Sequence, residues 1–526
     1  MEDKHIINRF PCQIITLLFG LNSVFTACVS LEPVSPSSLA KVDVEVLTPD
    51  ELNRLFMDAQ SLLIELIKTK SINPEGHEEW VTQLISAKLN EVGIQPHIQY
   101  FCEGRANVYA LLSPESIGQE TGTTQRSRST SDSGPICLLS HSDVVPAHPE
   151  GWSVPPFEGL IKEGYLYGRG ALDMKGITAL HLAAFRWIKQ RVDRGKLRLK
   201  RGLAIIVVGD EEVDNLGMIS LTQEKWDELN CAYVLNEGAF GVKDLLSKGQ
   251  DVMPISVGEK GVLWVKLKVE AKAGHGSVPR ASFAPHILLS ALERIRNYEA
   301  EPVISEALTE LFHAIGEDLG GLRGFILKRP LLTRWFALGD LLEAPEAAAA
   351  ITHTFHITGI NVHTHKPNVV PAEASALIDI RVRSGVAPEG VLDTLKRVIG
   401  DSRVEIEVLH SEASEISPWR GDPIYEALVR QTHRVFPSVV IGPATSVGFT
   451  DSTYARQKGA RAYGWAPLLL SKEELTTMHG IDERLSLEQL KKGLDALTGV
   501  LLEIVVDSRQ SPSSIHTSER EDAETP

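Results

Sequence analysis

Two side chains able to do acid, base or metal chemistry stand where an apolar run ends. In the segment LLSHSDVVPAHPEGW (138–152), three apolar or small residues are followed directly by His141, Ser142 and Asp143. An imidazole and a carboxylate are both costly to bury unless they are paired. Residues i and i+2 of an extended segment point the same way, so Asp143 can accept the ring N–H of His141 and fix the nitrogen that meets a metal ion. The spacing indicates a ligand and the residue that orients it.

Further carboxylates follow other apolar runs. Glu211 and Glu212 come just after LAIIVV (203–208), and Glu237 comes just after AYVL (232–235). In an open α/β sheet, ligands gather beyond the carboxyl ends of the strands. We therefore expect these carboxylates to converge with the histidine described above.

Two more candidates come from other parts of the chain. Asp173 lies at the start of a predicted helix in YGRGALDMKGITAL, and His479 lies in the loop TTMHGIDE before a C-terminal amphipathic helix. Two imidazoles and several carboxylates are the ligand set expected for zinc, with cobalt or manganese as substitutes. Asp173, Glu212 and Glu237 with a bridging hydroxide would balance two divalent ions, whereas one ion would leave carboxylates crowded and unpaired.

Each motif alone has an ordinary explanation. A lone His-x-Asp is often a coincidence, and a DEE segment at a strand end is usually a solvated loop or a helix cap. GRGALDMKG lacks the GK[ST] ending of a phosphate loop, and HEEWV (77–81) lacks the second histidine of a zincin. Neither a GxSxG elbow nor a persuasive Ser/His/Asp set is present. The metal hypothesis therefore depends on the whole set of residues.

The elements that must position these residues form an α/β pattern. Apolar strands are predicted at 136–140, 203–208 and 232–235, with a helix over Glu78–Asn90. Strands that are apolar throughout are covered on both faces, which predicts a central, mostly parallel sheet flanked by helices.

The middle of the chain has a different pattern. VKLKVE (265–270), LIDIRV (377–382) and VEIEV (404–408) alternate strictly, so each predicts a strand with one wet face. A fourth strand is expected around Thr354–Ile360, with helices over Pro285–Arg296 and Glu389–Ile399. The resulting order is a ferredoxin-like βαββαβ arrangement, inserted in the first domain as a lid.

The patterns divide the chain into seven segments. These are a signal peptide or lipoprotein signal (1–29), a linker (30–43), the first part of the catalytic domain (44–260), a lid or dimerisation domain (261–412) with a helical insertion (300–350), the second part of the catalytic domain (413–507) and a disordered tail (508–526).

The N-terminal segment favours export. CQIITLLFGLNSVFTAC follows a short charged start and ends in small residues, which fits an export signal better than a membrane span. FTAC also resembles a lipoprotein cleavage box with Cys28 as the lipid-bearing residue, and a signal anchor is the third alternative. We expect a periplasmic, secreted or lipid-anchored protein.

Charge and cysteine content exclude other classes. The net charge of -16 argues against nucleic-acid binding, which needs a basic surface. The five cysteines are Cys12, Cys28, Cys102, Cys137 and Cys231. They are too few and scattered for a disulfide framework, and Cys137 and Cys231 lie in or beside apolar runs, where reduced core thiols are expected.

As a set, the motifs resemble those of the dizinc amidohydrolase family that contains aminoacylase, carboxypeptidase S, acetylornithine deacetylase and succinyl-diaminopimelate desuccinylase. In chain order they are SHSDVVPA, WSVPPFEGLIKEGYLYGRGALDMKG, GDEEV, LNEG, GHGSVP, NVVPAEASALIDIRV, GFTDST and MHGIDE, across residues 50–505. The long lid insertion followed by TGINVHTHKPNVVP is most similar to the carboxypeptidase S and N-acyl-amino-acid hydrolase branch.

The resemblance implies a set of metal ligands. Asp173 would bridge two zinc ions in each subunit. His141 and Glu237 would hold one ion, and Glu212 and His479 would hold the other.

The resemblance also implies roles outside the ligand set. Glu211 would be the general base, and the lid residues His275, Asn368 and Arg381 would reach the substrate. A turn histidine, a turn asparagine and a wet-face strand arginine are their ordinary alternatives. Two motifs depart from the family: LNEG has Asn236 where aspartate is frequent, and TDST lacks the usual following arginine.

The leading functional hypothesis is a zinc-dependent hydrolase. It would cleave an amide or peptide bond next to a free carboxylate, in an N-acyl amino acid or a short peptide, with water activated by metal. The alternative is a catalytically silent relative that acts as a binding module. A homodimer through the lid is a further expectation.

Overall fold

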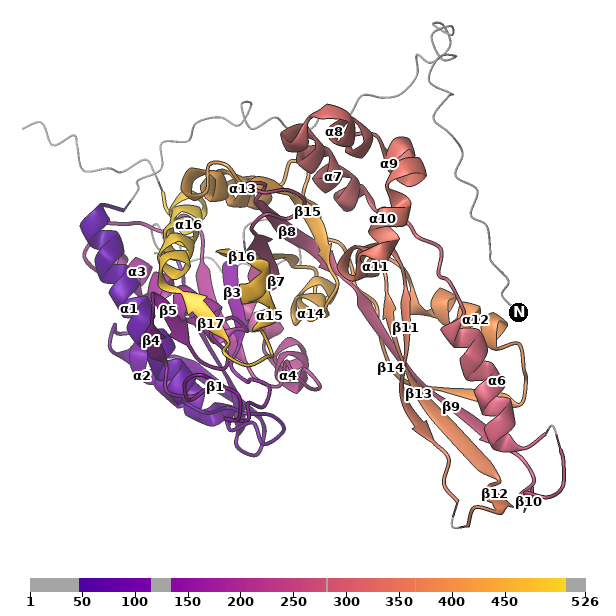
Figure 1. Cartoon of the computed structure of the whole chain (residues 1–526). Helices are drawn as coiled ribbons and strands as arrows, with labels where there is room; N and C mark the ends of the chain where they lie inside the picture. Colours follow the sequence, from indigo (N-terminus) through magenta and orange to yellow (C-terminus); the bar gives the residue numbers. More distant parts are fainter. Residues whose placement is uncertain (1–46, 115–133, 281, 365, 508–526) are drawn as a thin grey trace, which may run out of the picture. The chain divides into compact units, whose positions relative to one another are not determined.

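The computed structural model describes residues 47–114, 134–280, 282–364 and 366–507 (Figure 1). The predicted signal segment, the linker and the C-terminal tail lie outside the described residues. Of the helices in the described ranges, none combines the length and the apolar character needed to span a bilayer.

The predicted α/β sheet is present and has eight strands. Their order is β1-β2-β6-β3-β7-β16-β8-β15. The bounds are β1 His97–Cys102, β2 Arg105–Leu112, β3 Ile136–His141, β6 Leu203–Val208, β7 Tyr233–Val242, β8 Val252–Glu259, β15 Val440–Ser446 and β16 Arg461–Leu470. The central pairs β6–β3, β3–β7 and β7–β16 are parallel, and β1 and β2 form an antiparallel edge. Every residue of β3 and β6 is buried, as their apolar sequences predict.

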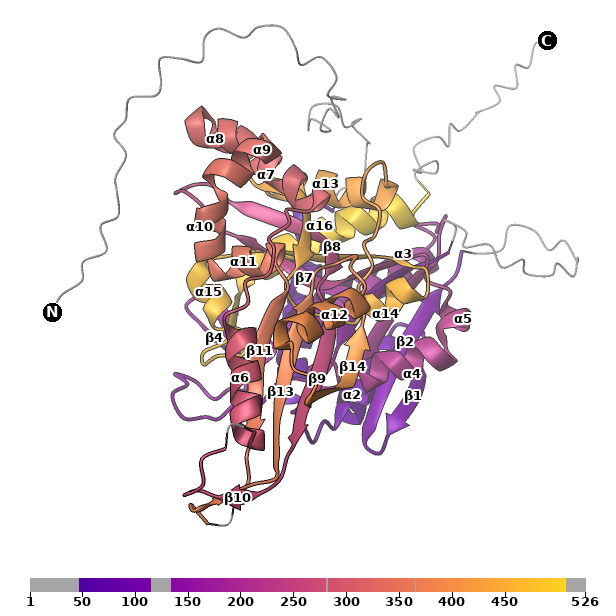
Figure 2. The same cartoon turned by 90° about the vertical axis from the view of Figure 1, so that its right-hand side faces the viewer.

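Helices cover both faces of this sheet (Figures 1 and 2). Those packed in the larger core are α1 (Pro49–Lys68), α2 (Glu78–Asn90), α3 (Lys175–Asp193), α13 (Pro423–Val435) and α16 (Leu487–Val505). The opposite face is covered by α4 (Leu216–Glu224), α5 (Trp226–Leu229) and α14 (Ser452–Gln457). A small sheet of β17 (Arg484–Ser486), β5 (Tyr165–Tyr167) and β4 (Leu160–Lys162) lies outside the large one, and α15 spans Lys472–Thr476.

The expectation of reduced thiols in the core is wrong for two cysteines. Cys137 and Cys231 form a disulfide, while Cys102 is free and exposed. Cys137 lies in β3 and Cys231 just before β7, and these two strands are neighbours in the sheet. Strand order therefore brings together two residues that are 94 positions apart in sequence.

Loss of this disulfide is expected to destabilise the chain. A cross-link restricts the unfolded state, so replacing Cys137 and Cys231 with alanine should lower the free energy of unfolding by about 2–5 kcal/mol. Urea unfolding of the double variant measures this, with Cys102→Ser as the control because that thiol makes no cross-link. Equal stability of all three proteins would contradict the expectation.

The lid sheet has the predicted ferredoxin-like order. Its strands are β9 (Gly261–Glu270), β11 (Thr354–Asn361), β13 (Glu373–Val382) and β14 (Val404–Glu412). They run antiparallel in the order β11-β13-β9-β14. Helices α6 (Ala284–Arg296) and α12 (Pro388–Ile399) pack on one face and bury the apolar side chains of β9 and β13 that point to them (Figure 2). In β14, Val404 is buried but Val408 is 44% exposed. A short ribbon of β10 (Gly274–His275) and β12 (Val369–Val370) completes the lid.

The segment 300–350 is helical, as predicted. It contains α7 (Glu306–Leu319), α8 (Gly321–Leu327), α9 (Pro330–Phe336), α10 (Leu338–Glu343) and α11 (Pro345–Ile351). Helix α7 packs with Leu308 and Leu311 against Val252 of β8 and Val440 of β15, at the edge of the large sheet.

Candidate metal centre

The carboxyl ends of three adjacent strands supply four of the predicted site residues. β3 ends at His141, the turn after β6 carries Glu211 and Glu212, and β7 contains Glu237. Because β6, β3 and β7 are neighbouring parallel strands, these residues lie at the same edge of the sheet.

Asp173 lies between two imidazoles. It lies two residues before the start of α3, with Oδ1 3.0 Å from Nε2 of His141 and Oδ2 3.0 Å from Nε2 of His479. Nε2 of His141 is also 3.6 Å from Oε1 of Glu237. Nε2 of His479 is 3.1 Å from Oε1 of Glu212. The carboxylate of Asp173 therefore separates two groups, each with one histidine and one glutamate.

The donor atoms are close enough to share metal ions. One atom from each of His141, Asp173 and Glu212 lies within 4.8 Å of the others, and the same holds for His141, Glu211 and Glu237. Imidazole nitrogens and carboxylate oxygens are donors that Zn²⁺ and related ions accept. The residues present thus fit a site for divalent cations.

The carboxylates of the cluster repel one another. Burial raises the pKa of Glu211 well above its ordinary value, and the charges of Glu237 and Asp451 add to this effect. Burial and the charge of Asp173 also raise the pKa of Glu237 well above its ordinary value. Asp451, in the TDST motif, accepts a 3.1 Å hydrogen bond from Asn215, and burial raises its pKa to about 7. Divalent cations would relieve this excess of negative charge.

The two histidines of the cluster are surrounded by carboxylates, which favour the protonated imidazole. Hydrogen bonds to Asp173 and Glu212 raise the pKa of His479 to about 10. Burial alone would lower the pKa of His141, but hydrogen bonds to Asp143 and Asp173 raise it well above the usual value. Without a cation, protons on the two imidazoles offset part of the negative charge of the carboxylates.

Metal binding is therefore expected to release protons. An imidazole must be neutral to bind a metal ion, and His479, with a pKa of about 10, is protonated at pH 7. Each ion that binds should displace about one proton or more, and apparent affinity should fall as the pH is lowered. Titration of metal-free protein with Zn²⁺ in weak buffer containing a pH indicator measures this. Binding without acidification at pH 7 would contradict the assignment.

Asp143 contacts the ring of His141 through its backbone carbonyl, whereas the sequence predicted a contact through its carboxylate. The hydrogen-bond partner of His141 Nδ1 is the backbone carbonyl of Asp143, at 3.0 Å, while the carboxylate Oδ1 is 3.5 Å away. That carboxylate instead accepts hydrogen bonds from Nδ2 of Asn73 (2.6 Å) and from the backbone N–H groups of Glu211 and Glu212 (3.1 Å each). Asp143 thus positions both the imidazole and the turn that carries two glutamates.

Asp143→Asn is expected to weaken metal binding by about 10- to 100-fold, the usual effect of losing a residue that positions ligands. All three partners of the Asp143 carboxylate donate hydrogen bonds to it. The amide N–H₂ of asparagine at this position would be a donor that faces other donors, so at least one of these hydrogen bonds would be lost. Competition with a chromogenic chelator measures the affinity. Asn73→Ala, which removes one donor and keeps both backbone contacts, is expected to have a smaller effect. Wild-type affinity in Asp143→Asn would refute this role.

Sequence reasoning missed Glu483, which holds the segment that presents Asp173. Its buried carboxylate accepts backbone hydrogen bonds from Gly170 (3.0 Å), Leu172 (2.8 Å) and Asp173 (3.1 Å), and Arg169 pairs with it at 2.5 Å. The motif MHGIDE contains this glutamate, but only its histidine suggested chemistry.

The structure pairs two of the three lid candidates with each other. Nδ2 of Asn368 is 3.2 Å from Nε2 of His275, and Nδ1 of His275 is 2.8 Å from the hydroxyl of Ser277. Arg381 donates to Asp379 at 3.0 Å on the lid sheet. The hydrogen bonds described for these three candidates all lie within the lid, so the structure does not bring them together with the metal cluster.

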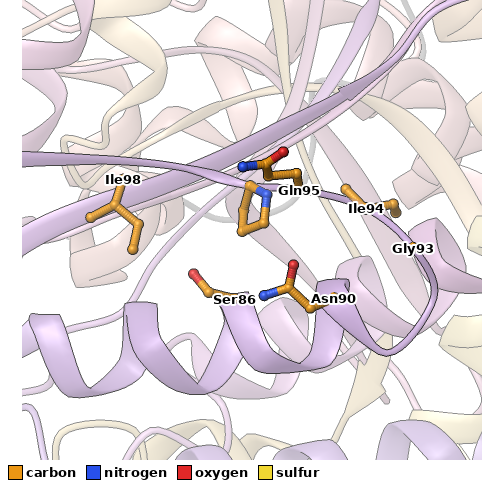
Figure 3. Close-up of a pocket in the computed structure, with 7 residues that line it drawn as sticks. Ser86, Asn90, Gly93, Ile94, Gln95 and Ile98 are labelled. Carbon is orange, nitrogen blue, oxygen red and sulfur yellow. The ribbon is translucent and has the colours of Figure 1, made fainter.

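A pocket lies elsewhere, between α2 and the start of β1 (Figure 3). Its lining residues are Ser86, Asn90, Gly93, Ile94, Gln95, Pro96 and Ile98. None of these side chains titrates near neutral pH, so the acid, base and ligand groups of the chain lie outside this pocket.

Histidines and carboxylates gathered at the carboxyl edge of an α/β sheet, with an inserted lid, are the arrangement expected of a hydrolase that works with metal ions. The family comparison agrees with this class. The family model described as Peptidase family M20/M25/M40 matches residues 137–503, and the chain belongs to this family.

Individual relatives confirm the predicted resemblance. An N-fatty-acyl-amino acid synthase/hydrolase PM20D1 of Xenopus tropicalis is 30% identical over 383 residues, which cover 71% of this chain and 72% of that protein. A probable carboxypeptidase S-like 2 of Dictyostelium discoideum is 27% identical over 376 residues, or 69% and 70% of the two chains. The M20 family metallo-carboxypeptidase Sso-CP2 from Sulfolobus solfataricus shares the fold, with a TM-score of 0.60 at 20% identity over 85% and 98% of the chains.

Proposed function

We propose that this hydrolase cleaves the amide bond of an N-acyl amino acid, next to the free carboxylate, with two Zn²⁺ ions bound. The observation that carries the proposal is the position of Asp173 between His141 and His479. The relative named as an N-fatty-acyl-amino acid synthase/hydrolase supports this substrate class over a short peptide.

The ligands divide into two groups. His141 and Glu237 would hold one ion, His479 and Glu212 the other, and Asp173 would bridge them. When bound, the zinc ions would lower the pKa of a water molecule and polarise the scissile carbonyl.

Glu211 is proposed as the general base. Its carboxylate belongs to the same donor group as His141 and Glu237, but it is not needed to complete the two ligand groups above. It would accept the proton of water as oxygen attacks the carbonyl carbon, then return it to the nitrogen as the C–N bond breaks. The products would be a carboxylic acid and a free amino acid.

The lid candidates His275, Asn368 and Arg381 remain proposed substrate-binding residues. Their exposed or half-exposed side chains would have to approach the cluster by movement of the lid or from a second subunit in a lid-mediated dimer. Export of the protein is also proposed, and the disulfide supports it because disulfides persist mainly in oxidising compartments.

A substrate panel tests the proposed function. Zinc-loaded protein would be assayed with N-acyl amino acids and with dipeptides that have the same C-terminal residue, with and without a chelator. We expect hydrolysis of N-acyl amino acids that a chelator abolishes and added Zn²⁺, Co²⁺ or Mn²⁺ restores. Preference for dipeptides would refute the substrate class, and binding without turnover would favour the silent alternative.

A further inference from the structure

Helices α8 and α9 expose five large apolar side chains, which we call the α8–α9 face. Their exposed fractions are Leu322 76%, Phe325 46%, Leu331 74%, Trp335 80% and Phe336 69%. Single exposed apolar residues are normal, but a group of this size within 15 positions marks an interaction surface. Figures 1 and 2 show α8 beside α7, with α9 next to it.

Packing on the opposite side fixes this orientation. Gly324 of α8 lies against the backbone of α7, so close that a Cβ added at Gly324 would be 2.2 Å from the carbonyl oxygen of Gly316. In α9, the buried hydroxyl of Thr333 donates to the carbonyl of Ile326 at 3.0 Å. These contacts occupy the inner side of both helices, so the apolar face is directed to solvent by the fold.

The charge of the same segment is unlike that of the whole chain. Residues 319–339 contain Arg323, Lys328, Arg329 and Arg334 and no aspartate or glutamate, whereas the net charge of the chain is -16. Arg329 stacks on the ring of Phe325, and Arg334 is 4.0 Å from Glu301 of another segment. Exposed Trp, Phe and Leu interleaved with Arg and Lys are typical of segments that lie in a membrane interface.

We propose that the α8–α9 face docks on the surface of an anionic phospholipid bilayer. The apolar side chains would enter the boundary between headgroups and acyl chains, and Arg323, Arg329 and Arg334 would contact lipid phosphates. A second copy of the chain is disfavoured as the occupant, because a symmetric contact would bring Arg323, Arg329 and Arg334 of both copies together. The inference does not depend on the proposed function.

Vesicle binding by the full chain tests the proposal. The wild type and the variant Leu331→Ser/Trp335→Ser/Phe336→Ser would be mixed with vesicles of phosphatidylcholine alone or with phosphatidylglycerol. We expect tighter binding to the anionic vesicles, weakened at high salt, and at least tenfold weaker in the variant.

A matched control removes exposed apolar residues from other surfaces. Leu246→Ser/Leu289→Ser/Ile360→Ser replaces side chains that are 54%, 65% and 61% exposed. It should bind as the wild type does, and thermal unfolding should show that both triple variants are folded.

Quenching of tryptophan fluorescence by brominated phospholipids measures whether one side chain contacts lipid. Any N-terminal anchor is the same in all variants, so it does not affect the comparison. Quenching of Trp335 is obtained as the difference between wild type and Trp335→Phe. Contact with lipid predicts strong quenching. No quenching of Trp335 on bound protein, equal binding by the two triple variants, or self-association through this face without lipid would each overturn the proposal.

Discussion

Glu211→Gln is expected to lower kcat by about 10²-fold or more while both metal ions remain bound. Glutamine keeps the size of the side chain but cannot accept a proton from water. Glu211 is half-buried, and burial raises the pKa of its carboxyl group well above the ordinary value. The proton-transfer role and the ligand role can therefore be separated at this residue.

The adjacent residue provides the control for this prediction. Glu212 contacts His479 at 3.1 Å, so Glu212→Gln should lower metal content as well as activity. Metal analysis with steady-state kinetics on both variants distinguishes the two roles. Full activity of Glu211→Gln would refute its assignment as the base, and loss of metal from it would show that it acts as a ligand.

Asp173→Ala is expected to have the second large effect, with metal content falling from two ions towards none. Its two oxygens are each 3.0 Å from a different imidazole, so one substitution removes a donor from both ligand groups. Metal ions contribute several kcal/mol to charge stabilisation in the transition state, and their loss should reduce hydrolysis by about 10³-fold or more.

Asp451→Asn is the matched control for this variant. Asp451 is buried beside the cluster but outside the proposed ligand set, and asparagine can still accept the hydrogen bond from Asn215. We expect this variant to retain both ions. If Asp173→Ala also keeps two ions, the proposed ligand set is wrong.

Local sequence patterns predicted the elements of the fold well. The helix over Glu78–Asn90 and the strand LAIIVV match α2 and β6 residue for residue. The alternating strands and the two lid helices agree with the structure to within a few residues at their ends. Periodicity succeeds here because β9, β13 and the two lid helices each have one buried face and one wet face. Convergence of His141, Glu211, Glu212 and Glu237 followed from one topological rule, that parallel strands present their carboxyl ends together, whereas Asp173 and His479 come from a helix start and a loop that this rule does not cover.

Contacts between distant segments could not be predicted in the same way. The Cys137–Cys231 disulfide requires knowing that β3 and β7 are neighbours. The carboxylate of Asp143 contacts Asn73, 70 positions away, and Glu483 reaches a loop more than 300 positions earlier in the chain. No local pattern records such partners, so the residues that support the metal ligands become visible only when the strand order is known.

Metal content of the zinc-loaded protein tests the central claim most directly. Elemental analysis after removal of free ions should give two zinc ions per chain for the wild type. A wild-type chain that retains no zinc under these conditions would contradict the metal centre, whatever the activity of the preparation.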